Sequence, residues 1–345
     1  MSTETTMQAW QFHAPGPLQS TLKLTPSVPR PSPSSLSPDQ VLVKPVATGI
    51  NPADFKVQEL GLIARAITGF PKTVGMDLAG TVQAVGPNVT TLRAGDTVVG
   101  RVSPFKAPGS LAPLVVADTV GLARLPDGID PVEAAGLPTG ALTAYQTIAP
   151  HVREGKGDRV LINGAAGGVG IFSVQVAKLL GCRVTATAST GRGVELAREL
   201  GADTVIDYRQ TDVVAHLKGK GEEYDLIVDN VGDGPADLFS SSRTYLGVGK
   251  PYVFAGGRMT MRSVFNLITA AVVPTALGGV KGRLVTFVAK DSAEDLERLL
   301  KWTAEGKLRI VVDSTFEFKD AKVAFEHLKA GRVKGKVIIK ASPDQ

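Results

Sequence analysis

Hydrophobic residues follow two different rhythms along the chain, and the rhythm changes near residue 130. Residues 1–130 contain short β-rich runs such as VLVKPVATGI (41–50) and LAGTVQAVG (78–86), separated by glycine and proline. Short runs between turn residues indicate strands. The stretch PSVPRPSPSSLSPD (26–39) is too rich in proline and serine for a helix or a central strand, so we expect a surface loop there. This part of the chain predicts an all-β domain.

From residue 131 onward, short apolar runs alternate with segments of helical spacing. Such alternation is typical of βαβ units around a parallel sheet. The segment 170–180 has apolar residues at helical spacing, and 193–201 ends on Gly201, which suits a helix C-cap. Six strands, as in a doubly wound dinucleotide-binding fold, are expected at 159–164, 183–188, 203–207, 224–229, 251–256 and 283–288.

The end of the chain is less regular and is expected to return to the first domain. Its pattern predicts helices at 292–304 and 319–330 and strands near 309–318 and 336–340. We therefore predict an α/β protein with two domains, a β-rich one formed by residues 1–130 and 289–345 and a Rossmann domain formed by residues 131–288.

The segment NGAAGGVG (163–170) is close to the G-x-G-x-x-G loop that holds a dinucleotide pyrophosphate. Aligned to that pattern, Ala165 replaces the tight-turn glycine, Gly167 lets the backbone approach the pyrophosphate, and Gly170 lets the helix close on the strand. The loop follows an apolar strand pattern and precedes an amphipathic helix pattern, whose first N–H groups would face the phosphates. This context favours nucleotide binding over a purely structural turn.

The end of the second expected strand bears on the choice of cofactor. An NAD site would place a carboxylate there for the ribose 2′-hydroxyl, but the segment is Ala188-Ser189-Thr190-Gly191-Arg192. The hydroxyl of Ser189 and the guanidinium of Arg192 suit a 2′-phosphate, so NADPH is preferred over NADH. The alternative is that Ser189 or Thr190 only caps the next helix and that Arg192 is a solvated residue.

Composition excludes several other functions. With 345 residues and 43% hydrophobic content, the chain can build two packed domains without disulfides or structural metals. The formal net charge is +5, but the basic residues are scattered and no RNA-type aromatic motif accompanies them, so no nucleic acid is expected as a partner. No apolar run spans a membrane and no secretory signal is readable, so we expect a cytoplasmic protein.

Metal and nucleophile chemistry are not supported by the residues present. A zinc site needs three or four ligands brought together, whereas the four histidines are far apart in the sequence and Cys182 is the one cysteine. Cys182 excludes an internal disulfide, suggests a reducing compartment and is more simply a small core residue. No hydrolase motif appears, so the chemistry should belong to the cofactor.

The order of the two domains resembles the medium-chain dehydrogenase/reductase superfamily, whose first domain is similar to the GroES fold. Zinc alcohol dehydrogenases of that superfamily have a cysteine where this chain has Gly49 or Ile50, and Gly-His-Glu where it has Gly75-Met76-Asp77. The chain therefore resembles the zinc-independent branch of quinone oxidoreductases similar to zeta-crystallin and of enoyl reductases. The resemblance rests on TGINPADFK (48–56), VGMDLAGTVQAVG (74–86), LRAGDTVVG (92–100), AAGLPTGALTAYQTI (134–148), VLINGAAGGVG (160–170), LGADTVIDY (200–208) and GRVKGKVII (331–339).

The resemblance also implies roles for individual residues. Asn51 and Lys56 match residues that face the cofactor and substrate cleft, and they are our candidate catalytic residues. Each has a plainer reading, since Asn51-Pro52 is a good turn and Asp54 could pair with Lys56. The residues implied to bind the cofactor are Thr139, Ala166, Gly167, Gly168, Val169, Ser189, Arg192, Tyr208, Ala255, Gly256 and Phe287, the last of which could instead be simple core.

The branch implies hydride transfer from NADPH to a quinone or to the activated C=C of an enone or enoyl substrate, in the manner of fungal secondary-metabolite pathways. Such a reaction needs a donor at the carbonyl oxygen and a proton for the α-carbon. The segment 57–70 has no tyrosine to serve as the acid, so Asn51, Lys56, the ribose hydroxyl or solvent remain the candidates. A homodimer is expected, and a monomer is the alternative.

Two questions stay open at this point. The apolar segment 259–280 could border a substrate pocket or form a subunit contact, and 103–113 could border the pocket as well. The alternative to an enzyme is an NADPH-binding structural or regulatory protein without substantial turnover.

Overall fold

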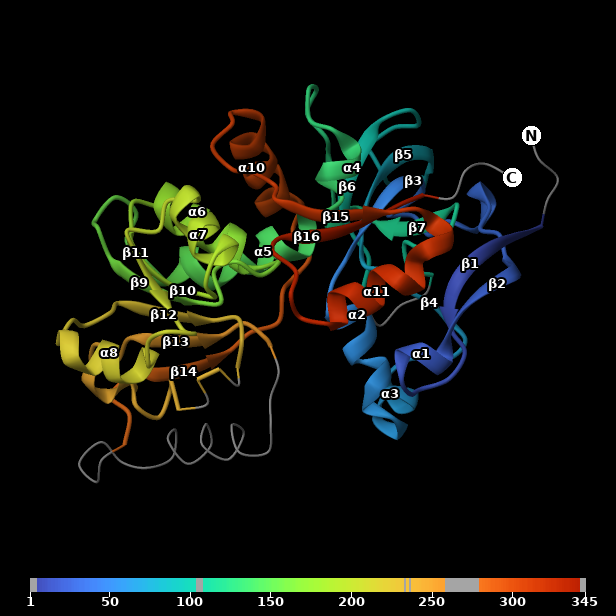
Figure 1. Ribbon diagram of the computed structural model, residues 1–345. Coiled ribbons are helices and arrows are strands. Elements are labelled where there is room, and N and C mark those ends of the chain that lie inside the picture. The colour runs from blue at the N-terminus through green and yellow to red at the C-terminus, as the bar shows by residue number, and fades with distance from the viewer. Residues whose placement is uncertain (1–4, 104–107, 233, 236, 258–278, 342–345) are drawn as a thin grey trace. The chain divides into compact units, whose positions relative to one another are not determined.

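The computed structural model describes residues 5–103, 108–232, 234–235, 237–257 and 279–341, and Figure 1 shows their arrangement in ribbon form. The chain divides into two compact units. The first unit consists of Met1–Leu142 and Lys290–Gln345, and the second consists of Thr143–Ala289. Most of the segment 259–280 lies outside the described residues, as do residues 104–107 of the segment 103–113.

The second unit is built on a six-stranded sheet with the order β11-β10-β9-β12-β13-β14, and each pair of neighbours is parallel. This is the strand order of the doubly wound dinucleotide-binding fold, in which the order reverses between the first and fourth strands of the unit. All six predicted strands are confirmed. They are β9 (Arg159–Asn163), β10 (Arg183–Ala188), β11 (Thr204–Asp207), β12 (Leu226–Asp229), β13 (Pro251–Phe254) and β14 (Arg283–Thr286).

Helices connect these strands as the sequence predicts. Helix α6 (Gly170–Leu179) is buried along its first eight residues and packs on β9 and β10, whereas α7 (Arg192–Glu199) buries one face. Gly201 follows α7 with φ +103°, a backbone conformation that glycine adopts without steric cost. Asp212 caps α8 (Val213–Lys220), because its carboxylate accepts from the N–H of Ala215 at 3.0 Å.

The first unit contains two sheets. A three-stranded sheet has the order β2-β1-β4, and a second sheet has the order β15-β16-β3-β5-β6-β8, with β7 paired to β3. The strands are β1 (Thr6–Phe12), β2 (Leu22–Pro29), β3 (Gln40–Ile50), β4 (Lys72–Thr73), β5 (Asp77–Val85), β6 (Thr97–Arg101), β7 (Val115–Asp118), β8 (Leu122–Arg124), β15 (Val312–Phe316) and β16 (Lys336–Lys340). The helices of this unit are α1 (Leu18–Thr21), α2 (Ala53–Lys56), α3 (Leu62–Ile67), α4 (Pro131–Ala134), α10 (Ala293–Ala304) and α11 (Ala321–Lys329), and α5 (Pro138–Ile148) begins in it.

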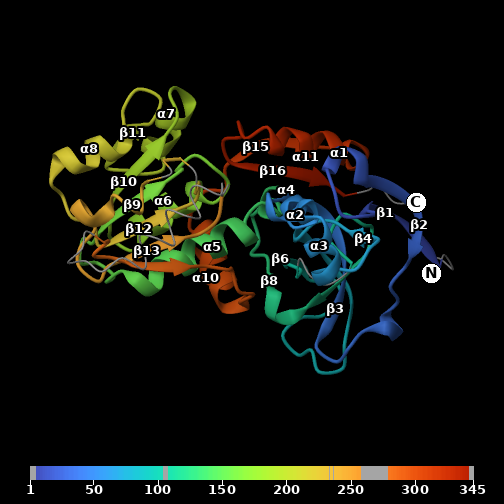
Figure 2. The same ribbon diagram turned by 90° about the horizontal axis from the view of Figure 1, so that it is seen from below.

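The end of the chain returns to the first unit, as predicted. Strand β16 pairs antiparallel with β3, so that Val337 lies opposite Ile50, and β15 pairs parallel with β16. Helix α11 packs on both strands, as the two views in Figure 1 and Figure 2 show. Ile50, Phe325 and Val337 belong to one hydrophobic core cluster, so the two ends of the chain fold together.

The prediction of a loop over 26–39 is partly wrong, because β2 extends to Pro29. Strand β2 pairs only with β1 in the sheet order, so it is an edge strand. An edge strand tolerates proline, which lacks the N–H that a central strand would have to donate. In the part of the chain that the structure describes, no helix is both long and apolar enough to cross a membrane.

Candidate functional site

The glycine loop lies between β9 and α6, at the carboxyl edge of the parallel sheet. Gly167, Gly168 and Val169 are half-buried and precede the first turn of α6, whereas Gly170 is buried. A Cβ on Gly170 would lie 2.0 Å from the carbonyl oxygen of Gly164, so no larger residue fits there. A Cβ on Gly167 would meet only that same oxygen at 3.6 Å, which leaves its outer side open to a ligand. The loop therefore has the close packing on one side and the accessible backbone on the other that a pyrophosphate needs.

The assignment of the tight-turn position to Ala165 is wrong by one residue. Gly164 has φ +83°, whereas Ala165 is fully buried and donates its N–H to the carbonyl of Thr187 at 2.9 Å. A Cβ on Gly164 would lie 2.5 Å from the side chain of Val231. The turn glycine is therefore present one position earlier, and the sequence signal for it was the Asn-Gly dipeptide.

A buried hydrogen-bond network joins four neighbouring strands beneath this loop. The carboxylate of Asp229 accepts hydrogen bonds from Asn163 Nδ2 at 2.8 Å and from the Tyr252 hydroxyl at 2.7 Å. It also accepts hydrogen bonds from the backbone N–H groups of Val231 and Gly232. Thr187 Oγ1 donates to Asn163 Oδ1 at 2.6 Å and accepts from the N–H of Gly164 at 2.9 Å. Burial and the nearby Asp229 raise the pKa of Tyr252 well above its ordinary value, so its hydroxyl stays a donor. The network holds the loop in one shape.

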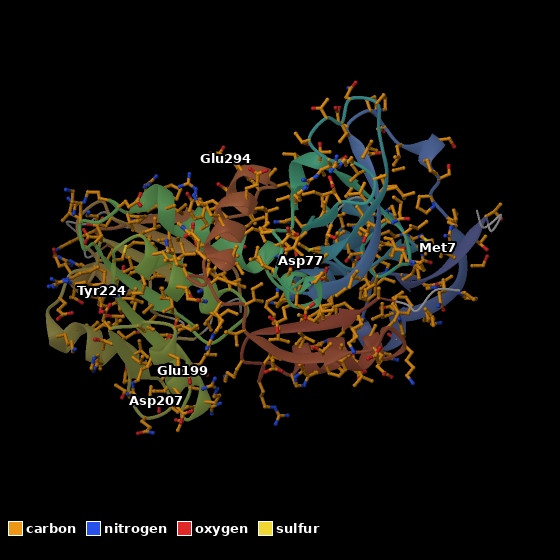
Figure 3. All side chains as sticks on the ribbon, turned by 90° about the horizontal axis from the view of Figure 1, so that it is seen from above. Met7, Asp77, Glu199, Asp207, Tyr224 and Glu294 are labelled. Atoms are coloured by element: carbon orange, nitrogen blue, oxygen red, sulfur yellow. The ribbon has the colours of Figure 1, made fainter. Side chains whose placement is uncertain are left out.

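The region proposed for the 2′-phosphate contains a carboxylate that the sequence reasoning missed. Ser189 is half-buried, and the hydroxyl of Thr190 donates to Asp207 Oδ2 at 2.7 Å. The signal was the parallel register, because Ala188 at the end of β10 lies opposite Asp207 at the end of β11. Figure 3 shows Asp207 and Glu199 at the periphery of the second unit. Asp207 lies at the end of β11, whereas the dinucleotide-binding motif places its acidic residue at the end of the second strand, here β10.

Arg192 is exposed and paired on its own helix. Its guanidinium donates to Glu199 through both terminal nitrogens and lies 3.9 Å from Glu195. This ion pairing raises the pKa of Arg192 further above its ordinary value, with the hydrogen bond to Glu199 as the main cause. A phosphate would therefore compete with Glu199 for the same nitrogens.

The remaining predicted cofactor residues of the second unit lie along the same sheet edge. Tyr208 follows β11 and is 45% exposed, with the guanidinium of Arg209 5.8 Å from its ring centre. Ala255 donates its N–H to the carbonyl of Asp229 at 2.9 Å, and Phe287 donates its N–H to Phe254 at 3.2 Å. The other residues of this group, Ala166 in the loop and Gly256 after β13, are buried and half-buried respectively. These residues thus follow the carboxyl ends of strands of one sheet.

Asn230 is a further residue at this edge that the sequence reasoning missed. It follows β12, and both polar atoms of its amide are buried without a hydrogen-bond partner among the described residues. Its Cβ lies 3.8 Å from the position that a Cβ on Gly164 would take. Buried amides are normally paired, so an unpaired one beside the loop is consistent with a ligand contact.

The first unit holds a second network, centred on Asp77 at the start of β5. Figure 3 labels this residue within the first unit, and its side chain is fully buried. Its Oδ1 accepts from the hydroxyl of Thr139 at 2.5 Å and from the N–H of Thr139 at 3.1 Å. Its Oδ2 accepts from Asn51 Nδ2 at 2.9 Å and lies 3.6 Å from Lys336 Nζ. Thr139, half-buried, is the member of the network that is accessible from outside.

Asn51 is held within this network by hydrogen bonds, whereas Lys56 is exposed. Besides its bond to Asp77, the Asn51 amide accepts from Lys336 Nζ at 2.6 Å, and it is 5% exposed. These contacts fix which way the amide points. Lys56, at the end of α2, has an exposed side chain. The two candidate catalytic residues therefore differ in exposure, since Asn51 is buried and Lys56 is exposed.

A pair of titratable residues next to this network borders a small cavity. Asp54 Oδ2 accepts the N–H of Asn51 at 2.7 Å, while Asp54 Oδ1 and Gln58 Oε1 are buried without partners among the described residues. Asp54 and Gln58 line a cavity of about 10 Å³, together with Lys72 and Met76. This is roughly the space that one water molecule needs. Desolvation raises the pKa of Asp54 to about 7 and lowers the pKa of Lys72 to about 8.

The residues present do not fit a zinc ion. No group of three His, Cys, Asp or Glu side chains in the described part of the chain could hold a metal. Met76 is buried where zinc relatives have histidine, and next to it the Asp77 carboxylate already faces the ammonium of Lys336. Cys182 is buried just before β10, as predicted, and desolvation raises its thiol pKa to about 11, so it stays protonated.

Two family models match the chain. The model of the alcohol dehydrogenase GroES-like domain matches residues 37–127, and the model described as zinc-binding dehydrogenase matches residues 200–339. The chain is also similar to a trans-enoyl reductase, pgmF, of Aspergillus terreus, with 42% identity over 97% of this chain and 96% of the relative.

Solved structures agree with this similarity. The quinone oxidoreductase of Coxiella burnetii has a TM-score of 0.82 and 29% identity, over 97% of this chain and 99% of that one. The native structure of mycobacterial Rv1454c complexed with NADPH has a TM-score of 0.78 and 26% identity, over 97% of this chain and 99% of that one. The α/β architecture, with a GroES-like β-rich unit and a Rossmann-like parallel sheet, is therefore confirmed.

Proposed function

Because the chain belongs to the medium-chain dehydrogenase/reductase family of oxidoreductases, we propose that it is a metal-free, NADPH-dependent reductase. Its substrate would be a quinone or the activated C=C of an enone or enoyl compound. The trans-enoyl reductase and quinone oxidoreductase among its relatives support this substrate class.

The observation that carries the proposal is the network around Asp77. Where zinc relatives have a histidine followed by a glutamate, this chain has buried Met76 and an Asp77 that is paired with Lys336 and hydrogen-bonded to Asn51. A zinc alcohol dehydrogenase uses its metal as a Lewis acid on an alcohol or carbonyl oxygen. Without ligands for such an ion, an acceptor that is already electron-poor suits the site better than an alcohol.

A reduced nicotinamide, when bound, would supply a hydride to such an acceptor, at the β-carbon in an enone or enoyl compound. Gly168 and Val169 would hold the pyrophosphate with their backbone N–H groups, while the N–H of Gly167 donates to the carbonyl of Gly164 at 3.3 Å. The buried Asn163–Thr187 pair would keep that loop in place. The negative charge that develops on the carbonyl oxygen needs a hydrogen-bond donor, and the α-carbon needs one proton. We propose the exposed Lys56 as a donor, while Asn51, whose amide already binds Asp77 and Lys336, would orient its neighbours.

The preference for NADPH rests on Arg192, the cationic residue that follows β10. Arg192 is the candidate for the 2′-phosphate, with Ser189 as a hydroxyl donor, and the relative complexed with NADPH supports a nicotinamide cofactor. Asp207 opposes this preference. Its carboxylate accepts the hydrogen bond of the Thr190 hydroxyl, and at that place its negative charge would repel the 2′-phosphate of NADPH. The balance between Arg192 and Asp207 therefore decides the cofactor.

The substrate class is tested by following the nicotinamide absorbance with quinones, enones and enoyl thioesters, each with NADPH and with NADH. We expect turnover of at least one class with NADPH and none of simple alcohols in the reverse direction. Titration of the cofactor by fluorescence in the same preparation separates two failures. Tight NADPH binding without turnover of any compound would favour a binding protein, and no binding of either cofactor would contradict the proposal as a whole.

A further inference from the structure

The ammonium of Lys336 faces oxygen atoms of two residues, Asn51 and Asp77, that are distant from it in the sequence. Its Nζ donates to Asn51 Oδ1 at 2.6 Å and lies 3.6 Å from Asp77 Oδ2, and Thr139 is bound to the other oxygen of the same carboxylate. The side chains of Lys336 and Asp77 are 2% and 0% exposed. Ions buried to this degree are stable only when they are paired and hydrogen-bonded.

Each hydrogen bond of this network has a fixed direction. The carboxylate of Asp77 only accepts, so Thr139 must give it its single hydroxyl hydrogen, and Asn51 must turn its Nδ2 toward Asp77 and its Oδ1 toward Lys336. The half-buried Thr139 therefore presents only oxygen lone pairs to the outside. This polarity depends on the carboxylate of Asp77, which lies 3.6 Å from the ammonium of Lys336.

Other charges near the network do not replace this cation. Asp54 and Asp77 both favour the charged form of Lys336, while its burial lowers its pKa. Arg101 acts on Asp54 and pairs with Asp291 at 3.1 Å, and the pKa of Lys72 reflects its own burial and Asp54. Lys336 is the cation for which a contact with both Asp77 and Asn51 is found among the described residues.

We propose that Lys336 is a built-in cation that takes the place of a metal ion at this site. As a positioning residue, it pairs with the carboxylate of Asp77 and donates to Asn51, and thereby fixes the orientation of Asn51 and Thr139. The inference deepens the proposed metal-free function, because it assigns the residue that makes the metal unnecessary.

The test is chemical rescue of Lys336→Ala, in which the side chain is removed and the oxygen atoms around it remain. We expect a lower denaturation midpoint and a turnover reduced at least tenfold. Millimolar ethylammonium or propylammonium should reverse at least half of the fall in the denaturation midpoint and should restore turnover to a similar degree. Propanol, which has a similar volume without charge, and Zn²⁺ should restore neither. Equal rescue by propanol would show that volume alone matters, and better rescue by Zn²⁺ would show a metal site; each result overturns the inference.

A second variant keeps the test decisive if the alanine variant does not fold. Lys336→Gln retains a hydrogen-bond donor for Asn51 but has no charge, so it should lower kcat and change the dependence of kcat on pH. A glutamine variant with the midpoint, kcat and pH profile of the parent protein would show that the charge is not needed. If the parent protein itself shows no turnover, the proposed function fails, whereas rescue of the midpoint by alkylammonium ions still tests the role of Lys336.

Discussion

The two units each bury a polar network around one aspartate, but they balance its charge in different ways. In the second unit, Asp229 is surrounded by neutral donors, among them Asn163 and the Tyr252 hydroxyl. In the first unit, Asp77 has neutral donors and also the ammonium of Lys336 at 3.6 Å. The first network therefore contains an ion pair that is removed from water, and the second contains a single carboxylate held by dipoles.

The difference matters because ions and dipoles respond differently to mutation and pH. Breaking a buried ion pair leaves an uncompensated charge, which is among the most destabilising changes a single mutation makes. Losing one neutral hydrogen bond costs less and acts mainly on local geometry. We therefore expect the first network to control stability and its dependence on pH, and the second to control the shape of the cofactor loop.

The largest effect is expected for Asp77→Asn. The substitution leaves Lys336 buried without its carboxylate, which should cost about 3 to 5 kcal/mol of unfolding free energy at neutral pH. The pKa of Lys336, already lowered by burial, should fall further, so the variant should regain stability as the pH rises and the ammonium is lost. Urea denaturation at pH 7 and pH 9.5 measures both effects.

The matched control for that variant is Glu317→Gln. Glu317 pairs with Lys340 at 3.0 Å at the end of the same strand, β16, but both side chains are about half exposed. Exposed pairs contribute about 0 to 1 kcal/mol, so the control should change little. Similar losses in the two variants would contradict the distinction between the networks.

Asp54→Asn should stabilise the protein near pH 7. The pKa of Asp54 is raised to about 7 by desolvation, from an ordinary value of 3.8. The contribution of Asp54 to the free energy of unfolding is thus fully present below pH 4. It is lost as the pH rises toward 7, by up to about 1.4 kcal/mol for each pH unit. The amide has no charge to desolvate and can still accept from the N–H of Asn51, so the variant should gain about 2 to 4 kcal/mol over the parent between pH 4 and pH 7.

Denaturation midpoints of both proteins across that pH range provide the measurement. A difference between variant and parent that stays constant with pH would rule out the titration of Asp54 as its cause. Asp39→Asn is the control, since Asp39 is exposed and lies before the first residue of β3.

Thr187→Val tests the neutral network. Valine has the same shape but lacks the hydroxyl, which leaves Asn163 Oδ1 and the N–H of Gly164 without their partner. The expected cost is about 1 to 3 kcal/mol of stability, together with weaker cofactor binding. Thr187→Ser should recover both. Thr147→Val is the control, because the Thr147 hydroxyl is also buried but donates to carbonyl oxygens of its own helix. Fluorescence titration of NADPH that gives equal affinity for the parent and Thr187→Val would exclude a role in the loop.

The smallest effect is expected at the surface of the second unit. Arg192→Ala should weaken the binding of NADPH about tenfold and leave the binding of NADH nearly unchanged. The effect is small because Arg192 has to give up its ion pair with Glu199 when it binds the phosphate. Glu199→Gln should strengthen NADPH severalfold, since it releases the guanidinium, and Asp207→Asn should do the same by removing a repulsive charge. Dissociation constants for both cofactors, measured at low and high salt, check these shifts. An unchanged NADPH/NADH ratio in Arg192→Ala would remove Arg192 from the cofactor site.

The second unit could be predicted largely from the sequence, because its signals are local. Each strand from β9 to β14 is a short apolar run, and the loop at 163–170 lies between one such run and a helix pattern. One error there was local, because the turn glycine is Gly164. The other was not, because Asp207 reaches the end of β10 only through the parallel pairing of β10 and β11.

The network of the first unit could not be predicted in this way. Asn51 and Lys336 are separated by 285 positions, and neither residue type is unusual where it stands in the sequence. The motif GRVKGKVII (331–339) indicated the family but not the partner of its lysine. A sequence pattern reports the spacing within one element, whereas a buried ion pair depends on which elements become neighbours.

The amino-acid sequence by itself thus determined the order of the strands and helices and the place of the glycine loop, because periodicity and residue type carry that information directly. The tertiary structure alone decided that β16 returns to lie beside β3, which places the ammonium of Lys336 against Asn51 and Asp77. The physical reason is that a charged side chain can be buried only where the fold supplies its counter-charge, and that place is defined by contacts between distant segments.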